Sequence, residues 1–105
     1  MYKIEITKPA EKDLLDAALY IKEQLLNPAA ANRLLDEAEK VILSLGSMPE
    51  RQALVNDEVL ARSGLRSVPV LNYTIFYAVR EERSTIVIHR ILYSRRDWAS
   101  LMKSE

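Results

Sequence analysis

The apolar positions at the start of the chain first alternate and then recur at helical spacing. Ile4 and Ile6 alternate with polar residues between Tyr2 and Thr7, which predicts a first strand. Four apolar residues then recur three or four positions apart: Leu14, Ala18, Ile21 and Leu25. This spacing predicts a helix with one apolar face. Pro9 suits the first turn of that helix, where its missing N–H costs nothing.

A second helical pattern follows after a very short link at Asn27 and Pro28. Asn27 is a good N-cap for the new helix, and Gly46 is well placed as its C-cap. The apolar residues of this helix are Leu34, Leu35, Ala38, Val41, Ile42 and Leu45. Because the link is short, we expect the two helices to form an antiparallel hairpin.

The next segment, residues 47–63, contains Pro49 and shows no clear period. It predicts a loop with a short turn of helix, and a loop of this length is uncommon in a compact domain unless it is functional. The residues that follow Gly64, LRSVPV, predict a strand. Pro69 cannot donate a hydrogen bond to a neighbouring strand, so this strand is expected at an edge of the sheet.

Two strongly apolar strands and a short helix are predicted in the remainder. The range 73–79 is rich in aromatic and β-branched residues, and 80–84 is the turn that follows it. The range 85–93 is nearly continuous in apolar residues, which indicates a central strand covered on both faces. The range 95–102 predicts a short terminal helix with Trp98 on one side.

The order β-α-α-β-β-β, with the short C-terminal helix, predicts an α+β fold. The helical hairpin would pack on one face of a small, mostly antiparallel sheet. We expect this core to contain helix residues and strand residues in contact: Leu14, Ile21, Leu34, Val41 and Leu45 against Ile75, Tyr77, Ile86 and Ile88. The length of 105 residues, 49% of them apolar, suits one domain over 1–105.

The composition argues against several classes of functional site. The chain has no Cys and a single His, so neither a disulfide framework nor a Cys/His metal site is expected. Gly46 and Gly64 are the only glycines, which excludes a Gly-rich phosphate loop. No apolar run approaches about 18 residues, the length that would predict a membrane span. We therefore expect no cofactor, no metal and no membrane partner, and a cytoplasmic location.

The net charge is zero, but the charge is unevenly distributed. Residues 1–60 contain 7 Lys and Arg against 11 Asp and Glu, whereas residues 61–105 contain 8 against 4. A basic half can bind an anionic partner even when the whole chain is neutral.

The candidate functional residues are concentrated near the C-terminus. Within eight positions the chain carries His89, Arg90, Tyr93, Arg95 and Arg96. Histidine can exchange a proton near neutral pH, and the arginine fork binds two phosphate or carboxylate oxygens at once. If the strand is regular, His89 faces away from Arg90 and shares a face with Tyr93.

Arg66 is a further candidate, because it lies on a predicted strand and could meet Arg90 on one sheet face if the register allows. A purely structural interpretation also stays open. In it, Arg90 pairs with an acidic residue and His89 is a hydrogen-bonded surface residue. Asp97 would then N-cap the last helix while Trp98 packs on the core.

The chain resembles the RelE/ParE superfamily of toxins from type II toxin–antitoxin systems, also called plasmid stabilisation proteins. The resemblance covers nearly the whole chain and is carried by five segments in this order: TKPAEKDL (7–14), LGSMP (45–49), Gly64-Leu65-Arg66, YTIFY (73–77) and RILYSRRDW (90–98). It implies a growth-inhibiting toxin that forms a hetero-oligomer with a cognate antitoxin.

The resemblance implies one of two targets. Resemblance to the ParE-like members implies inhibition of DNA gyrase. Resemblance to the RelE-like members implies cleavage of mRNA on the ribosome. The ending RILYSRRDW is closer to ParE, and a neutral chain is poorly suited to ribosomal RNA. We therefore favour gyrase inhibition over an enzymatic activity. The residues expected to bind the target are Arg90, Tyr93, Arg95, Arg96 and Trp98.

Two alternatives to gyrase inhibition stay open. As a nuclease, the chain would use Arg66, His89, Arg90 and Tyr93 for base, acid and phosphate stabilisation. As a non-toxic, degenerate toxin, it would serve only as an antitoxin-binding module.

Overall fold

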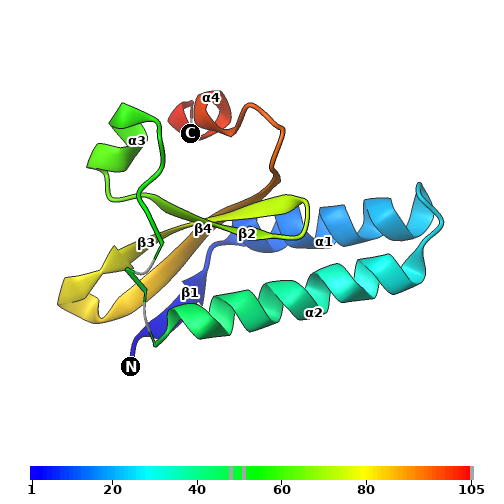
Figure 1. Ribbon diagram of the computed structural model, residues 1–105, viewed down its shortest axis with the longest axis horizontal. Coiled ribbons are helices and arrows are strands. Elements are labelled where there is room, and N and C mark those ends of the chain that lie inside the picture. The colour runs from blue at the N-terminus through cyan, green and yellow to red at the C-terminus, as the bar shows by residue number, and fades with distance from the viewer. Residues whose placement is uncertain (48, 51, 105) are drawn as a thin grey trace.

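The structure, a computed structural model, describes residues 1–47, 49–50 and 52–104. A four-stranded sheet lies between a long helical hairpin on one face and two short helices on the other (Figure 1). The elements are β1 (Lys3–Ile6), α1 (Lys8–Glu23), α2 (Pro28–Leu45), α3 (Glu58–Arg62), β2 (Arg66–Val70), β3 (Tyr73–Arg80), a 3₁₀ turn (Glu81–Arg83), β4 (Thr85–Tyr93) and α4 (Trp98–Lys103). The predicted α+β fold is confirmed.

The sheet has the strand order β1-β4-β3-β2. The pairs β2–β3 and β3–β4 are antiparallel, and β1 pairs in parallel with β4. The nearly continuous apolar strand, β4, is internal, and the strand that contains Pro69 lies at an edge, as predicted. β1 pairs with β4 only as far as Ile6 and Ile88, because the chain then turns into α1.

Side-chain caps define the ends of the helical hairpin. The Thr7 hydroxyl oxygen accepts a hydrogen bond from the Ala10 N–H at 3.1 Å, and the Asn27 side chain accepts one from the Ala30 N–H at 3.1 Å. Gly46 is the C-cap of α2, as predicted. The prediction for Leu25 is wrong: α1 ends at Glu23, and Leu25 is 56% exposed in the turn before α2.

The main core lies between the helical hairpin and the sheet. Its buried residues include Ala38, Ile42, Leu45, Ile75, Tyr77, Ile86 and Ile88, with Leu14 and Val41 packed against them at partial burial. Leu34 is also buried, at 1% exposure. The predicted packing is therefore confirmed for most residues. Ile21 is only half-buried and lines a surface hollow instead.

A second core covers the opposite face of the sheet. Val55, Leu65, Phe76 and Leu92 are buried there, and Leu60, Trp98, Leu101 and Met102 pack against them from α3 and α4. The rings of Phe76 and Trp98 lie 4.8 Å apart between centroids. Asp97 caps α4 by accepting from the Ser100 N–H at 3.3 Å. The structural interpretation of Asp97 and Trp98 is confirmed. The short helix predicted within 47–63 is confirmed as α3. Residues 48 and 51 of that segment lie outside the described part.

An ion pair links the two short helices and predicts a pH-dependent stability. The Asp57 carboxylate accepts from Lys103 Nζ at 2.8 Å and from the Leu60 N–H at 3.1 Å. These bonds, the Lys103 bond above all, lower the pKa of Asp57. A carboxyl whose pKa is lower in the folded state stabilises the fold above its unfolded pKa, near 3.9, and loses that contribution as pH falls through the folded value.

We therefore expect Asp57→Asn to lower the melting temperature at pH 7, and the deficit to shrink as the pH falls below about 4. Thermal unfolding followed by circular dichroism across pH 2.5–7 measures this. Asp36→Asn, at an exposed position of α2, is the matched control. A deficit of equal size at every pH would show that the carboxylate charge is not the cause.

Candidate target-binding site

The second half of β4 contains an irregularity at His89. Phe76 pairs with Arg90 and Tyr77 with Ile88, so the register shifts by one residue at His89. This arrangement is a β-bulge, which places two residues against one and interrupts the alternation of faces. The expectation that His89 and Arg90 lie on opposite faces assumed a regular strand, and that assumption is wrong. The Thr7 hydroxyl donates to the His89 carbonyl at 2.9 Å, which holds the bulge to the start of α1.

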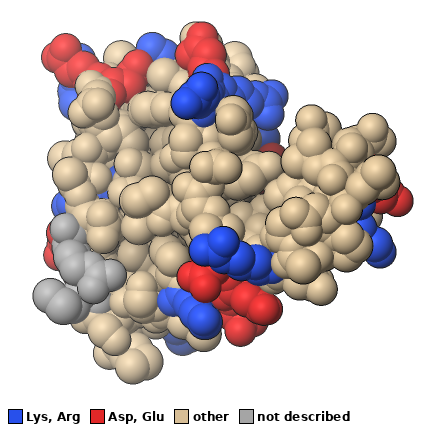
Figure 2. All heavy atoms as spheres, turned by 45° about the vertical axis from the view of Figure 1, so that its right-hand side comes forward, with Lys and Arg blue, Asp and Glu red and all other residues tan. Residues whose placement is uncertain are grey.

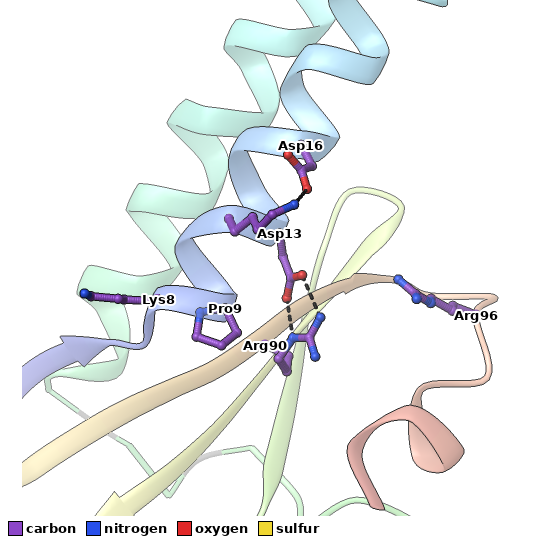
Figure 3. A pocket seen from close by; sticks show the side chains of 7 residues that line it. Lys8, Pro9, Asp13, Asp16, Arg90 and Arg96 are labelled. Carbon is purple, nitrogen blue, oxygen red and sulfur yellow. Dashed lines mark hydrogen bonds and ion pairs between the residues drawn. The ribbon is translucent and has the colours of Figure 1, made fainter. Parts of the chain in front are cut away.

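Arg90 forms a two-point ion pair with Asp13 of α1 (Figure 3). Its Nε donates to Asp13 Oδ2 at 2.6 Å and its Nη2 to Oδ1 at 2.8 Å. The same Oδ2 accepts the Ile91 N–H at 3.1 Å, on the edge of β4 that β1 no longer covers. The Arg90 and Asp13 side chains are only 14% and 12% exposed. The structural interpretation of Arg90, in which it pairs with an acidic residue, is therefore confirmed.

Arg66 lies on β2, separated from Arg90 by β3, and binds different partners. Its Nη1 donates to the Gln52 carbonyl at 2.6 Å, and its Nη2 lies 3.7 Å from a Glu50 carboxylate oxygen. The acceptors of Arg66 lie in the segment before α3, whereas Arg90 binds Asp13 of α1. The structure therefore does not bring Arg66 and Arg90 together.

The turn that follows β4 exposes the remaining candidates. The Arg96 N–H donates to the Tyr93 carbonyl at 3.0 Å, which reverses the chain before α4. Arg95 and Arg96 are exposed on this turn, and Tyr93 is 46% exposed. Trp98, by contrast, is held against Phe76. Of the five residues predicted to bind a target, Tyr93, Arg95 and Arg96 are thus the accessible ones.

A charged hollow of about 530 Å³ lies beside the Asp13–Arg90 pair (Figure 3). Its lining includes Lys8, Lys12, Asp16 and Arg96. Lys12 Nζ pairs with Asp16 at 2.6 Å on the exposed surface of α1. With the carboxylates present, this hollow is mixed in charge and not uniformly basic.

A second, largely apolar hollow of about 690 Å³ lies between the far end of the helical hairpin and the strand ends. Tyr20 from α1, Tyr73 from β3 and Tyr93 from β4 line it. The rings of Tyr73 and Tyr93 meet edge to face, with centroids 5.8 Å apart and planes at 74°. Burial raises the pKa of Tyr73, and the neighbouring Tyr20 and Tyr93 add to the effect.

The described residues contain neither a cluster of metal ligands nor a membrane-spanning helix. Among them, no three His, Cys, Asp or Glu side chains gather as a metal site would require. None of the described helices combines the length and the apolarity needed to cross a bilayer.

The matching protein family decides the class of the molecule. The family model of the ParE toxin of the type II toxin–antitoxin system parDE matches residues 4–98, nearly the whole chain. The chain belongs to the ParE toxin family. It is therefore a toxin of a type II toxin–antitoxin system.

Solved structures show the same fold. A chain of the chromosomal ParDE system from P. aeruginosa is 22% identical, with a TM-score of 0.69, over 89% of this chain and 96% of that one. The isolated E. coli RelE toxin is 14% identical, with a TM-score of 0.59, over 99% and 98%. A chain of the E. coli RelBE complex is 14% identical, with a TM-score of 0.59, over 91% and 100%. A comparison with curated proteins finds no significant match.

Sequence reasoning missed three residues that shape the site of this ParE-family toxin. Asp13 lies within the TKPAEKDL segment, but nothing in that segment indicates that it binds Arg90. Tyr20 and Tyr73 were not selected either, although both are aromatic residues near the ends of their elements. The signal that could have indicated them is an aromatic residue near the end of a helix or strand.

Proposed function

We propose that this ParE-family toxin arrests growth by binding and inhibiting DNA gyrase through the turn after β4. The observation that carries the proposal is the contrast among its arginines. Arg95 and Arg96 are exposed beside Tyr93, whereas Arg66 and Arg90 are each engaged by acceptors of the fold itself. Arginine and tyrosine are enriched among the residues that contribute most of the binding energy in protein interfaces.

The alternative of RelE-like mRNA cleavage receives less support from the geometry. That reaction needs a base, an acid and phosphate-binding arginines close together around one phosphodiester. Arg66 and Arg90 lie on strands separated by β3, and each is engaged by other groups of the fold, Arg90 by Asp13. The RelE structures among the neighbours favour this alternative only at the level of the fold.

The experiment that separates the two targets follows both in the same cells. After induction, the topology of a reporter plasmid and the 5′ ends of a reporter mRNA are measured together. Gyrase inhibition predicts relaxed plasmid and intact mRNA. Codon-specific mRNA ends with normal supercoiling would contradict it, and unimpaired growth would favour the third reading, a non-toxic antitoxin-binding module.

We further propose that a cognate antitoxin covers an exposed apolar strip along the outside of the helical hairpin. Leu15, Leu19 and Leu43 are 53%, 50% and 64% exposed there, and Ile6 of β1 is 47% exposed. A hollow of about 420 Å³ between β1 and the hairpin includes Ile6 and Leu43 in its lining. An amphipathic helix suits such a groove. The toxin and its antitoxin would both lie in the cytoplasm, together with gyrase.

This proposal predicts the effect of one charge on the strip. Leu43→Glu should weaken antitoxin binding by about tenfold or more, because a carboxylate would be desolvated in the interface. Val59→Glu, at a position of α3 that is 57% exposed, is the matched control and should bind normally. Titration calorimetry with the protein of the neighbouring gene measures both affinities. Equal binding by the two variants would place the antitoxin elsewhere.

A further inference from the structure

A groove lined by three tyrosines lies at the surface beside the main core. Tyr20, Ile21 and Ala30 form the wall on the hairpin side, and Asn72, Tyr73 and Tyr93 form the wall on the sheet side. We call this surface the tyrosine groove. Figure 1 shows the β2–β3 turn lying over α1, and the end of the hairpin extending beyond the sheet. In Figure 2 this end is a mostly uncharged protrusion, separated from the body by a notch.

The groove exposes large aromatic and aliphatic side chains to solvent. Tyr20 is 55% exposed and Tyr93 46%, and Leu25 at the hairpin end is 56% exposed. Large apolar and aromatic side chains grouped around one hollow are typical of a binding surface. Because the Tyr73 and Tyr93 rings support each other edge to face, this wall is already ordered before any partner binds.

Each end of the tyrosine groove opens toward an arginine. A hollow of about 390 Å³ shares Ile21, Ala30 and Tyr73 with the groove and reaches Arg33. Another hollow of about 210 Å³ shares Tyr73 and Tyr93 with it and reaches Arg96. Both arginines are exposed. The surface is therefore apolar and aromatic at its centre, with Arg33 at one end and Arg96 at the other. Asp13 and Asp16 also line the Arg96 end, where Arg90 and Lys12 pair with them.

We infer that the tyrosine groove binds an extended segment of gyrase that carries a large apolar side chain flanked by carboxylates. This inference rests on the proposed function and adds to it the place and the chemistry of the contact. The apolar side chain would lie among the tyrosines, and the carboxylates would reach Arg33 and Arg96. The groove meets the turn after β4 at Tyr93, so the contact is continuous with Arg95 and Arg96.

The overall charge favours a peptide over a nucleic-acid strand in the groove. The chain has no net charge, whereas single-strand binding grooves are strongly basic.

Filling the groove tests the inference. Ala30→Trp would place an indole in the groove, whereas Ala29→Trp changes the exposed neighbouring position on the same turn of α2. We expect Ala30→Trp to raise the concentration for half-inhibition of reconstituted gyrase about tenfold, and Ala29→Trp to leave it within about twofold. Both variants should bind the antitoxin as the wild type does, which also shows that they are folded.

A second variant leaves the packing intact. Tyr20→Ala removes a half-exposed ring and should also weaken gyrase inhibition, with antitoxin binding unchanged. Normal inhibition by both Ala30→Trp and Tyr20→Ala would overturn the inference and leave the proposed function in place. Loss of antitoxin binding by folded Ala30→Trp, or binding of a fluorescent single-stranded oligonucleotide that Ala30→Trp blocks, would assign the groove to another partner. Wild-type protein without any effect on gyrase would instead refute the proposed function itself.

Discussion

Replacing Asp13 by alanine is expected to lower the free energy of unfolding by about 3 kcal/mol, because it removes a carboxylate that binds the poorly solvated Arg90 guanidinium at two points. The two side chains are 12% and 14% exposed, so water compensates for little of the loss. The Ile91 N–H also loses its acceptor on the uncovered edge of β4. Urea unfolding followed by tryptophan fluorescence measures the change through Trp98.

A double-mutant cycle isolates the ion pair. Arg90→Ala should also destabilise the protein, and the Asp13→Ala/Arg90→Ala variant should lose clearly less than the sum of the single losses. Asp13→Asn is the matched control, because its oxygen can still accept the Ile91 N–H while the charge is removed. It should therefore fall between the wild type and Asp13→Ala. A loss below about 1 kcal/mol for Asp13→Ala would mean that the pair behaves like an exposed salt bridge.

Replacing Arg95 and Arg96 together by alanine is expected to weaken gyrase inhibition about thirtyfold or more and to abolish growth arrest. The reason is that two exposed, positively charged side chains of the proposed interface are lost, at a combined cost of roughly 2 kcal/mol. The free energy of unfolding should stay within about 0.5 kcal/mol of the wild type, because neither side chain is buried.

The matched control changes two arginines on other surfaces. Arg62 ends α3 and Arg83 ends the 3₁₀ turn, and both are exposed. Arg62→Ala/Arg83→Ala removes the same charge and should keep full toxicity. If both double variants lost toxicity equally, a general effect of positive charge would explain the result, and the turn after β4 would have no special role.

The fold could be predicted because its signals are local. The helical recurrence of Leu34, Ala38 and Leu45, the cap at Asn27 and the apolar run of β4 each follow from a few neighbouring residues. Pro69 alone indicated an edge strand, and β2 is one. Leu25 was misplaced because the helical period continues past Glu23, whereas the chain must reverse before Asn27, with Leu26 at a positive φ of 51°.

The site depends on contacts that no local pattern contains. Asp13 and Arg90 are 77 positions apart, and their pairing arises because β1 ends early and leaves the edge of β4 to α1. The bulge at His89 is set by the pairing of β3 with β4, so a single strand does not predict it. The tyrosine groove similarly requires α1, β3 and β4 in their final positions. Sequence reasoning nevertheless selected Tyr93, Arg95 and Arg96, which the fold leaves exposed.

Inhibition of purified gyrase tests the central claim most directly. Relaxed plasmid, ATP and reconstituted gyrase are titrated with the wild-type toxin, Arg95→Ala/Arg96→Ala and Arg62→Ala/Arg83→Ala, and the supercoiled product is measured. We predict dose-dependent loss of supercoiling with the wild type and the control, and about thirtyfold weaker inhibition with Arg95→Ala/Arg96→Ala. Full supercoiling at every concentration of a wild-type toxin that arrests growth and cleaves ribosome-bound mRNA would contradict the account.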